Sequence, residues 1–99
     1  MILCEPTKRG DQVKVTFVLP AGEGAVAVVG DFNGWNPAAN QLRRRGDVRS
    51  VTLTLSAGRR YAFRYQGADG QWFNDDQAHA YEPNGFGGQN CIIDLTRPR

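Results

Sequence analysis

The chain has 99 residues, of which 40% are hydrophobic and 22% are charged, and its formal net charge at pH 7 is +2. This length predicts one domain over residues 1–99 and excludes a catalytic α/β barrel of about 250 residues. The ordinary hydrophobic content argues against disorder, and the small dispersed charge argues against a dedicated nucleic-acid binder.

The first half of the chain predicts two strands and one charged loop. Over 13–19, hydrophobic side chains alternate with more polar ones until Pro20, a pattern typical of a strand with one buried face. The small apolar run 25–29 lies between glycines and predicts a central strand covered on both faces. Arg43, Arg44 and Arg45 form the only run of like charges, which is expected to lie in a solvated loop.

The second half of the chain continues the same period of two. Alternation over 51–55 and 61–65, with a turn at Ala57-Gly58, predicts a hairpin. Shorter strands are predicted at 71–74 and 91–93, and no segment places apolar residues at helical spacing over ten residues.

Short strands separated by frequent Gly and Pro turns predict an all-β fold. A Greek-key β-sandwich of about seven short antiparallel strands is favoured over a small barrel, with a core over about 11–95 and loose ends. No signal peptide and no membrane-spanning apolar run is evident, so a cytoplasmic location is expected. In that setting Cys4 and Cys91 are expected to be reduced thiols, although neighbouring terminal strands would allow them to pair.

Three segments are richer in aromatic and polar residues than a β-scaffold requires: 30–37, 69–72 and 84–90. Trp35 lies between two turn signals and Trp72 follows another, and each is either a buried core residue or an exposed binding ring. The segment 84–90 is either a plain glycine-rich connection or a loop that presents Phe86 to a ligand.

These residues suit a sugar. A pyranose has an apolar C–H face, which flat aromatic rings such as Trp35, Trp72 and Phe86 cover. Its rim of hydroxyls accepts and donates hydrogen bonds, for which Arg64 and Asn90 carry suitable groups. A site of this kind needs no metal and no cofactor.

Catalysis is not expected. His79 is the only histidine, and with Asp75 and Asp76 it makes a weak candidate metal trio. A glycosidase needs two carboxylates facing each other, whereas the adjacent Asp75 and Asp76 point to opposite sides of an extended chain. No Ser or Cys stands beside a plausible base, and the segment 22–24 leads into a strand instead of the helix that a phosphate loop needs.

Four motifs occur in order: Gly-Asp-Phe-Asn-Gly-Trp-Asn at 30–36, Tyr-Ala-Phe-Arg-Tyr at 61–65, Asp-Gly-Gln-Trp at 69–72 and Asn-Cys-Ile-Ile at 90–93. Together they resemble the family 48 carbohydrate-binding modules, and among these the glycogen-binding domain of the AMP-activated protein kinase β subunit. The resemblance covers about residues 11–95. It implies an immunoglobulin-like, early-set sandwich and non-catalytic binding of α-glucans such as glycogen or starch-like chains.

The resemblance also assigns roles by position. Trp35 and Trp72 match the two tryptophans that stack on glucose rings in the kinase domain. Arg64 stands where the kinase domain has a Lys that contacts hydroxyls. Phe86 replaces a loop Leu that reaches into a curved glucan, and Asn90 matches an Asn that hydrogen-bonds sugar.

The expected partner is an α-glucan polysaccharide or oligosaccharide, and a glucan-metabolising enzyme or kinase is a further candidate. Nucleic acid and membranes are not expected partners. One alternative is a protein-interaction domain of the same fold that docks on such an enzyme or kinase without sugar affinity. Another is a fragment of a glucan-processing enzyme, against which the initial Met and the absence of a linker weigh.

Overall fold

The computed structural model describes residues 1–22, 24–85 and 87–96. Within these ranges there are nine β-strands and one short 3-10 helix, η1 (Asp31–Asn33). The strands are β1 (Ile2–Pro6), β2 (Gln12–Pro20), β3 (Val26–Gly30), β4 (Arg43–Arg45), β5 (Val48–Ser56), β6 (Arg60–Gly67), β7 (Trp72–Phe73), β8 (Ala80–Pro83) and β9 (Gln89–Asp94). No helix in the described part of the chain is long and apolar enough to cross a membrane.

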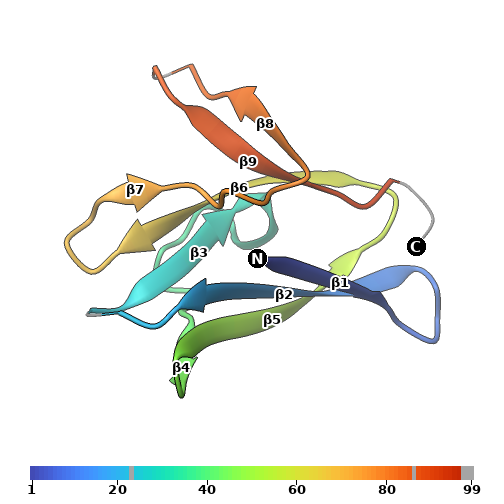
Figure 1. Cartoon of the computed structure of the whole chain (residues 1–99). Helices are drawn as coiled ribbons and strands as arrows, with labels where there is room; N and C mark the ends of the chain where they lie inside the picture. The colour runs from blue at the N-terminus through green and yellow to red at the C-terminus, as the bar shows by residue number, and fades with distance from the viewer. Residues whose placement is uncertain (23, 86, 97–99) are drawn as a thin grey trace.

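The strands form two antiparallel sheets that pack face to face (Figure 1). The first sheet has the order β1-β2-β5-β4, and the second has the order β3-β6-β9-β8 with β7 beside β6. Alternate residues of β2 and β6 meet in the core, where the ring centroids of Phe17 and Phe63 are 5.2 Å apart. These two sheets confirm the predicted all-β, immunoglobulin-like sandwich. The fold forms because each sheet has one apolar face, and the two sheets bury these faces against each other.

Strands β1, β4 and β8 are absent from the sequence prediction. The first ten residues were expected to be loose, but β1 pairs with β2, with Ile2 opposite Phe17. The arginine run 43–45, expected in a loop, forms the exposed edge strand β4 beside β5. Short or charged strands at sheet edges lack the clear alternation that identifies longer ones.

Strand β3 is buried as predicted, but it is not the central strand that the sequence analysis expected. It lies at one edge of the second sheet, next to β6 alone among the strands. The segment 40–42 covers its free side, where the Val28 amide donates to the Asn40 carbonyl and the Leu42 amide donates to the Val26 carbonyl, each at 2.9 Å. All five residues of β3 are consequently buried.

The two cysteines lie on different sheets and are not joined by a disulfide. Cys4 is half-buried in β1, and Cys91 is buried in β9. Burial raises the pKa of the Cys91 thiol to about 11. Because a thiol is nucleophilic only when deprotonated, Cys91 is unreactive at neutral pH.

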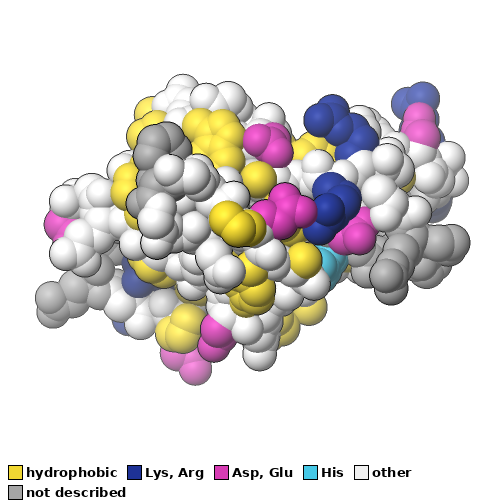
Figure 2. Space-filling view, turned by 90° about the horizontal axis from the view of Figure 1, so that it is seen from above, with side chains coloured by type: hydrophobic (Ala, Val, Ile, Leu, Met, Phe, Trp, Pro, Cys, Tyr) yellow, Lys and Arg dark blue, Asp and Glu magenta, His cyan; other side chains and the backbone are white. Residues whose placement is uncertain are grey.

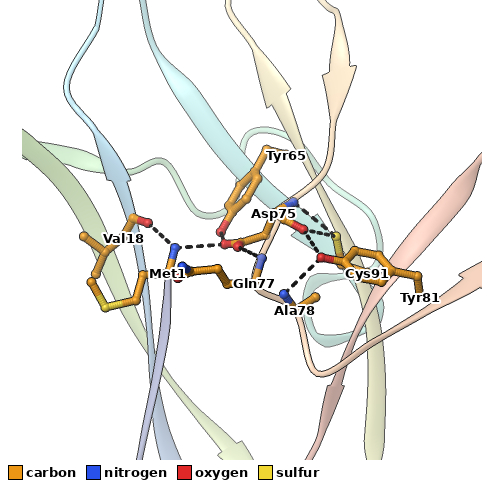
Figure 3. A network of polar contacts seen from close by, with 8 residues as sticks. All are labelled: Met1, Val18, Tyr65, Asp75, Gln77, Ala78, Tyr81 and Cys91. Carbon is orange, nitrogen blue, oxygen red and sulfur yellow. Dashed lines mark hydrogen bonds and ion pairs between the residues drawn. The ribbon is translucent and has the colours of Figure 1, made fainter.

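A buried carboxylate links the segment after β7 to neighbouring strands and to the N-terminus (Figure 3). Asp75 is 2% exposed. Its carboxylate accepts hydrogen bonds from the Tyr65 hydroxyl at 2.7 Å and from the backbone N–H of Gln77 at 2.8 Å. The Met1 amino group lies 3.2 Å from the same carboxylate. The backbone of Asp75 is held as well, since its amide contacts Cys91 Sγ at 3.2 Å and its carbonyl accepts from the Tyr81 hydroxyl at 2.6 Å.

We expect Tyr65→Phe to lower the free energy of unfolding by about 1–3 kcal/mol, because it removes a donor from a buried carboxylate. Urea denaturation at neutral pH measures this loss. Tyr61→Phe is the matched control, since its hydroxyl donates to the partly buried Ser56 carbonyl at 2.8 Å. The control should cost less, about 0.5–1.5 kcal/mol. Equal stabilities for Tyr65→Phe and the wild type would show that Asp75 does not depend on this bond.

Candidate functional site

Three of the predicted sugar-contacting side chains lie together on the structure. Trp35, Arg64 and Trp72 line one hollow of about 320 Å³, with Asn84 as a fourth lining residue. They come from the segment after β3, from β6, from β7 and from the residue that follows β8. The hollow therefore combines two indole rings with a guanidinium and an amide.

Trp35 is held in an unusual backbone conformation. Its φ is +58°, in the left-handed region, which a bulky residue adopts only when surrounding contacts require it. The Trp35 amide donates to the Gly30 carbonyl at 3.0 Å. Gly30 itself must be glycine, because an added Cβ would lie 2.4 Å from the Ala62 carbonyl oxygen. The turn thus packs directly against β6.

Asp31 fixes the orientation of the Trp35 ring. One oxygen of its carboxylate accepts the indole N–H of Trp35 at 3.0 Å. The other accepts the backbone amide of Ala62 on β6 at 2.8 Å. A single carboxylate therefore links the tryptophan to the sheet, and the half-buried ring of Trp35 is held in place before any ligand arrives.

Arg64 is also positioned by a neighbour. Its Nε donates to Asn74 Oδ1 at 2.7 Å, and Asn74 Nδ2 donates to the Gln89 carbonyl at 2.9 Å. This chain of bonds joins β6, the segment after β7 and the start of β9. Because only Nε is used in this bond, the terminal nitrogens of the guanidinium remain able to donate to a ligand.

Trp72 is the most exposed aromatic ring of the hollow, at 43%. It lies opposite Gln66 on the two-residue strand β7, which pairs with β6. Two hydrogen bonds close the preceding turn. The backbone N–H of Gln71 donates to Asp69 Oδ1 at 3.0 Å, and the backbone N–H of Gly67 donates to the backbone carbonyl of Gln71 at 2.9 Å. An exposed indole on a strand held this way is a ring available for stacking.

Two predicted residues are not placed in the hollow. Asn90 is half-buried on β9, paired with Glu82, and is not among the described lining residues. Phe63 of β6 pairs with Cys91 of β9, and Arg64 and Asn90 are the next residues along these two strands. Because consecutive residues of a strand point to opposite faces, Arg64 and Asn90 both lie on the face opposite to Phe63 and Cys91. Phe86 lies outside the described residues.

Three contributors were missed by sequence reasoning. Asn84 lines the hollow, whereas Asp31 and Asn74 position Trp35 and Arg64. Asp31 lies inside a motif that the sequence analysis quoted, so its place beside the tryptophan was visible. Asn74 had no local signal, because its partners come from β6 and β9.

Two of the residues considered for catalysis or metal binding, Asp75 and His79, make structural contacts. Asp75 is buried in the network described above, and the His79 ring nitrogen Nδ1 accepts the Asp94 amide at 2.9 Å. Among the described residues, no group of three or more His, Cys, Asp or Glu gathers closely enough to hold a metal ion.

The molecular surface seen from the β8–β9 side mixes all types of side chain (Figure 2). Among the described side chains, hydrophobic groups lie there beside both acidic and basic ones.

Residues 4–84 match the family model described as carbohydrate-binding module 48 (isoamylase N-terminal domain). The match includes Trp35, Arg64, Trp72 and Asn84, and it ends before Phe86 and Asn90. None of the curated proteins compared with the chain matches it.

We expect Asp31→Asn to loosen Trp35, because an amide offers one acceptor oxygen where the carboxylate offers two. Either the Trp35 indole or the Ala62 amide loses its acceptor, at a cost of about 1–2 kcal/mol in unfolding free energy. In a Trp72→Phe background, the fluorescence of Trp35 should also shift towards the red. Asp47→Asn is the control, because it makes the same charge change on an exposed turn. Equal effects of the two substitutions would contradict this positioning role.

Proposed function

The chain belongs to the carbohydrate-binding module 48 family, and from this premise we propose that it binds α-glucans such as glycogen or starch-like chains, without catalysing their conversion. The observation that carries the proposal is the hollow that joins Trp35, Trp72, Arg64 and Asn84. Its indoles provide apolar surface for the C–H faces of glucose, and its guanidinium and amide suit the hydroxyl rim.

A curved chain is expected to bind better than a flat one, because the family site that this one resembles grips a curved glucan. Rings that line a hollow contact a ligand from more than one direction, as a helical α-glucan or a cyclodextrin requires. A flat β-glucan would instead suit a planar row of rings. Phe86 and Asn90 are included in the proposed site on the strength of the resemblance alone, as residues that would extend contact along the curved chain.

Pre-organisation supports binding by a domain this small. Asp31 holds Trp35, and Asn74 holds Arg64, before the ligand arrives. Fixing side chains in advance lowers the entropy cost of association, which amounts to about 0.5–1.5 kcal/mol for each rotamer-rich side chain that binding immobilises. The left-handed conformation of Trp35 fits the same interpretation, since backbone strain concentrates at functional sites.

Trp72→Ala and Trp35→Gly should each weaken binding of β-cyclodextrin by about 1–3 kcal/mol, because each removes a stacking ring. Unfolding free energy should change little for Trp72→Ala, since Trp72 is exposed. In Trp35→Gly the relieved backbone strain offsets only part of the lost bond between the indole and Asp31. Isothermal titration with β-cyclodextrin and maltoheptaose, with cellohexaose as the negative control, measures the effect.

Val48→Ala is the matched control, since Val48 is an exposed apolar residue on the first sheet. It should bind as the wild type does. Failure of the wild type to bind either α-glucan would refute the proposal and favour the alternative, a protein-docking domain without sugar affinity. A sharp loss of stability with intact affinity would identify either Trp as a core residue instead.

Glucan affinity should be nearly independent of salt, because neutral sugars release no counterions on binding. Replacing Arg43, Arg44 and Arg45 together by Ser should leave it unchanged, since these exposed residues lie on β4 of the first sheet. Titrations between about 50 and 500 mM salt test this, as a nucleic-acid complex would weaken by orders of magnitude over that range. A steeply salt-dependent affinity would contradict a neutral glucan as the ligand.

A further inference from the structure

A second hollow, of about 410 Å³, lies at the end of the sandwich near the turn between β6 and β7. Phe73 of β7 lines it together with Asp69 and Gln71 of the turn before β7, and Arg49 of β5 lines it from the first sheet. The remaining lining residues are small or apolar, and are Gly24, Ala25, Val26, Gly67 and Ala68. None of these residues lines the hollow around Trp35 and Trp72.

Strand β7 separates the two hollows. Consecutive residues of a strand point to opposite faces, and here Trp72 lines the first hollow while Phe73 lines the second. In the described structure β7 pairs with β6 alone, so its other edge is free of strand pairing. Figure 1 shows β7 at the periphery of the second sheet, beside the end of β6. A bound chain that passes over this free edge meets both aromatic rings.

Phe73 has the exposure of a binding ring. Its side chain is 38% exposed, while its centroid lies 5.4 Å from that of Tyr65, which packs in the core. The core therefore fixes one side of the ring, and the other side faces solvent. Such a ring presents a flat, rigid apolar surface without needing a ligand to order it.

The polar groups of the second hollow favour a neutral, hydroxyl-rich ligand. The Arg49 guanidinium is anchored by Nε to the Pro20 carbonyl at 3.1 Å and by Nη1 to the Gly24 carbonyl at 2.7 Å. Asp69 supplies an opposite charge, and no ion pair within 4.0 Å joins the two among the described residues. Opposite charges favour neither an anionic nor a cationic ligand, and both groups hydrogen-bond hydroxyls.

We propose that the second hollow is a further glucan subsite, which a chain bound at Trp72 reaches by crossing the free edge of β7. Phe73 stacks on a sugar ring there, and Gln71, Asp69 and Arg49 bind its hydroxyls. The proposal rests on the proposed function, since it extends the same ligand beyond the first hollow. It makes affinity depend on chain length.

The test compares a long linear glucan with a closed ring. Maltodecaose can span both hollows, whereas β-cyclodextrin fills the first and cannot continue over β7. Phe73→Leu keeps apolar volume against Tyr65 but removes the flat ring, and Gln71→Ala removes a surface amide. Each variant should bind maltodecaose about threefold to tenfold more weakly than the wild type and bind β-cyclodextrin within about twofold of it.

Trp72→Ala is the reference variant, and it should lose affinity for both ligands. If both second-hollow variants bind maltodecaose as the wild type does, the further subsite is refuted while the first site stands. If they lose affinity for both ligands equally, they act by displacing β7, which also refutes it. Should Phe73→Leu fail to fold, Gln71→Ala decides. Absence of wild-type binding to β-cyclodextrin would instead refute the proposed function itself.

Discussion

The buried carboxylate of Asp75 is the constraint on which the rest of the structure depends. A buried charge is tolerated only when its hydrogen-bonding capacity is filled, and in the described structure every buried side-chain nitrogen or oxygen has a partner. Tyr65 on β6 fills part of this need, and the Asp75 backbone reaches Cys91 on β9 and Tyr81 on β8. These bonds fix the path of the chain after β7, and they thereby bring Asn74 within reach of Arg64.

Trp35 is positioned differently, by hydrogen bonds within the turn that follows β3. The Asn33 side chain accepts the Gly30 amide at 3.0 Å and donates to the Val28 carbonyl at 3.0 Å, so it fastens the turn to β3. Within this turn Trp35 takes a left-handed backbone, at a cost of about 1–3 kcal/mol for such a conformation. Asp31 then links the indole to β6. Local strain is offset by the contacts that position the ring.

The features that could be predicted from the sequence depend on residues close together in the chain. The features that could not be predicted depend on contacts between distant segments. The alternation of β2, β5 and β6 follows from one buried face, so these strands were predictable, and the sandwich followed from them. The grouping of Trp35, Arg64 and Trp72 was expected from their suitability for a sugar and from the family resemblance. The burial of Asp75 was not, because its partners lie on strands distant in sequence, and it was weighed as a candidate metal ligand or catalytic acid instead. Strand β3 was predicted to be a central strand because its residues are all small and apolar. That composition indicates burial, but it does not show that the segment 40–42 covers the strand instead of a second neighbouring strand.

Strand β6 explains how so small a sandwich separates stability from recognition. Its odd-numbered residues Tyr61, Phe63 and Tyr65 point into the core, whereas Arg64 and Gln66 lie on the opposite face. Substitutions on one face therefore leave the other largely intact, because period two keeps the two sets of contacts apart. The same alternation continues across the turn into β7, where Trp72 and Phe73 divide between two hollows. One hairpin thus supplies core packing, the proposed sugar site and a route for the ligand beyond it.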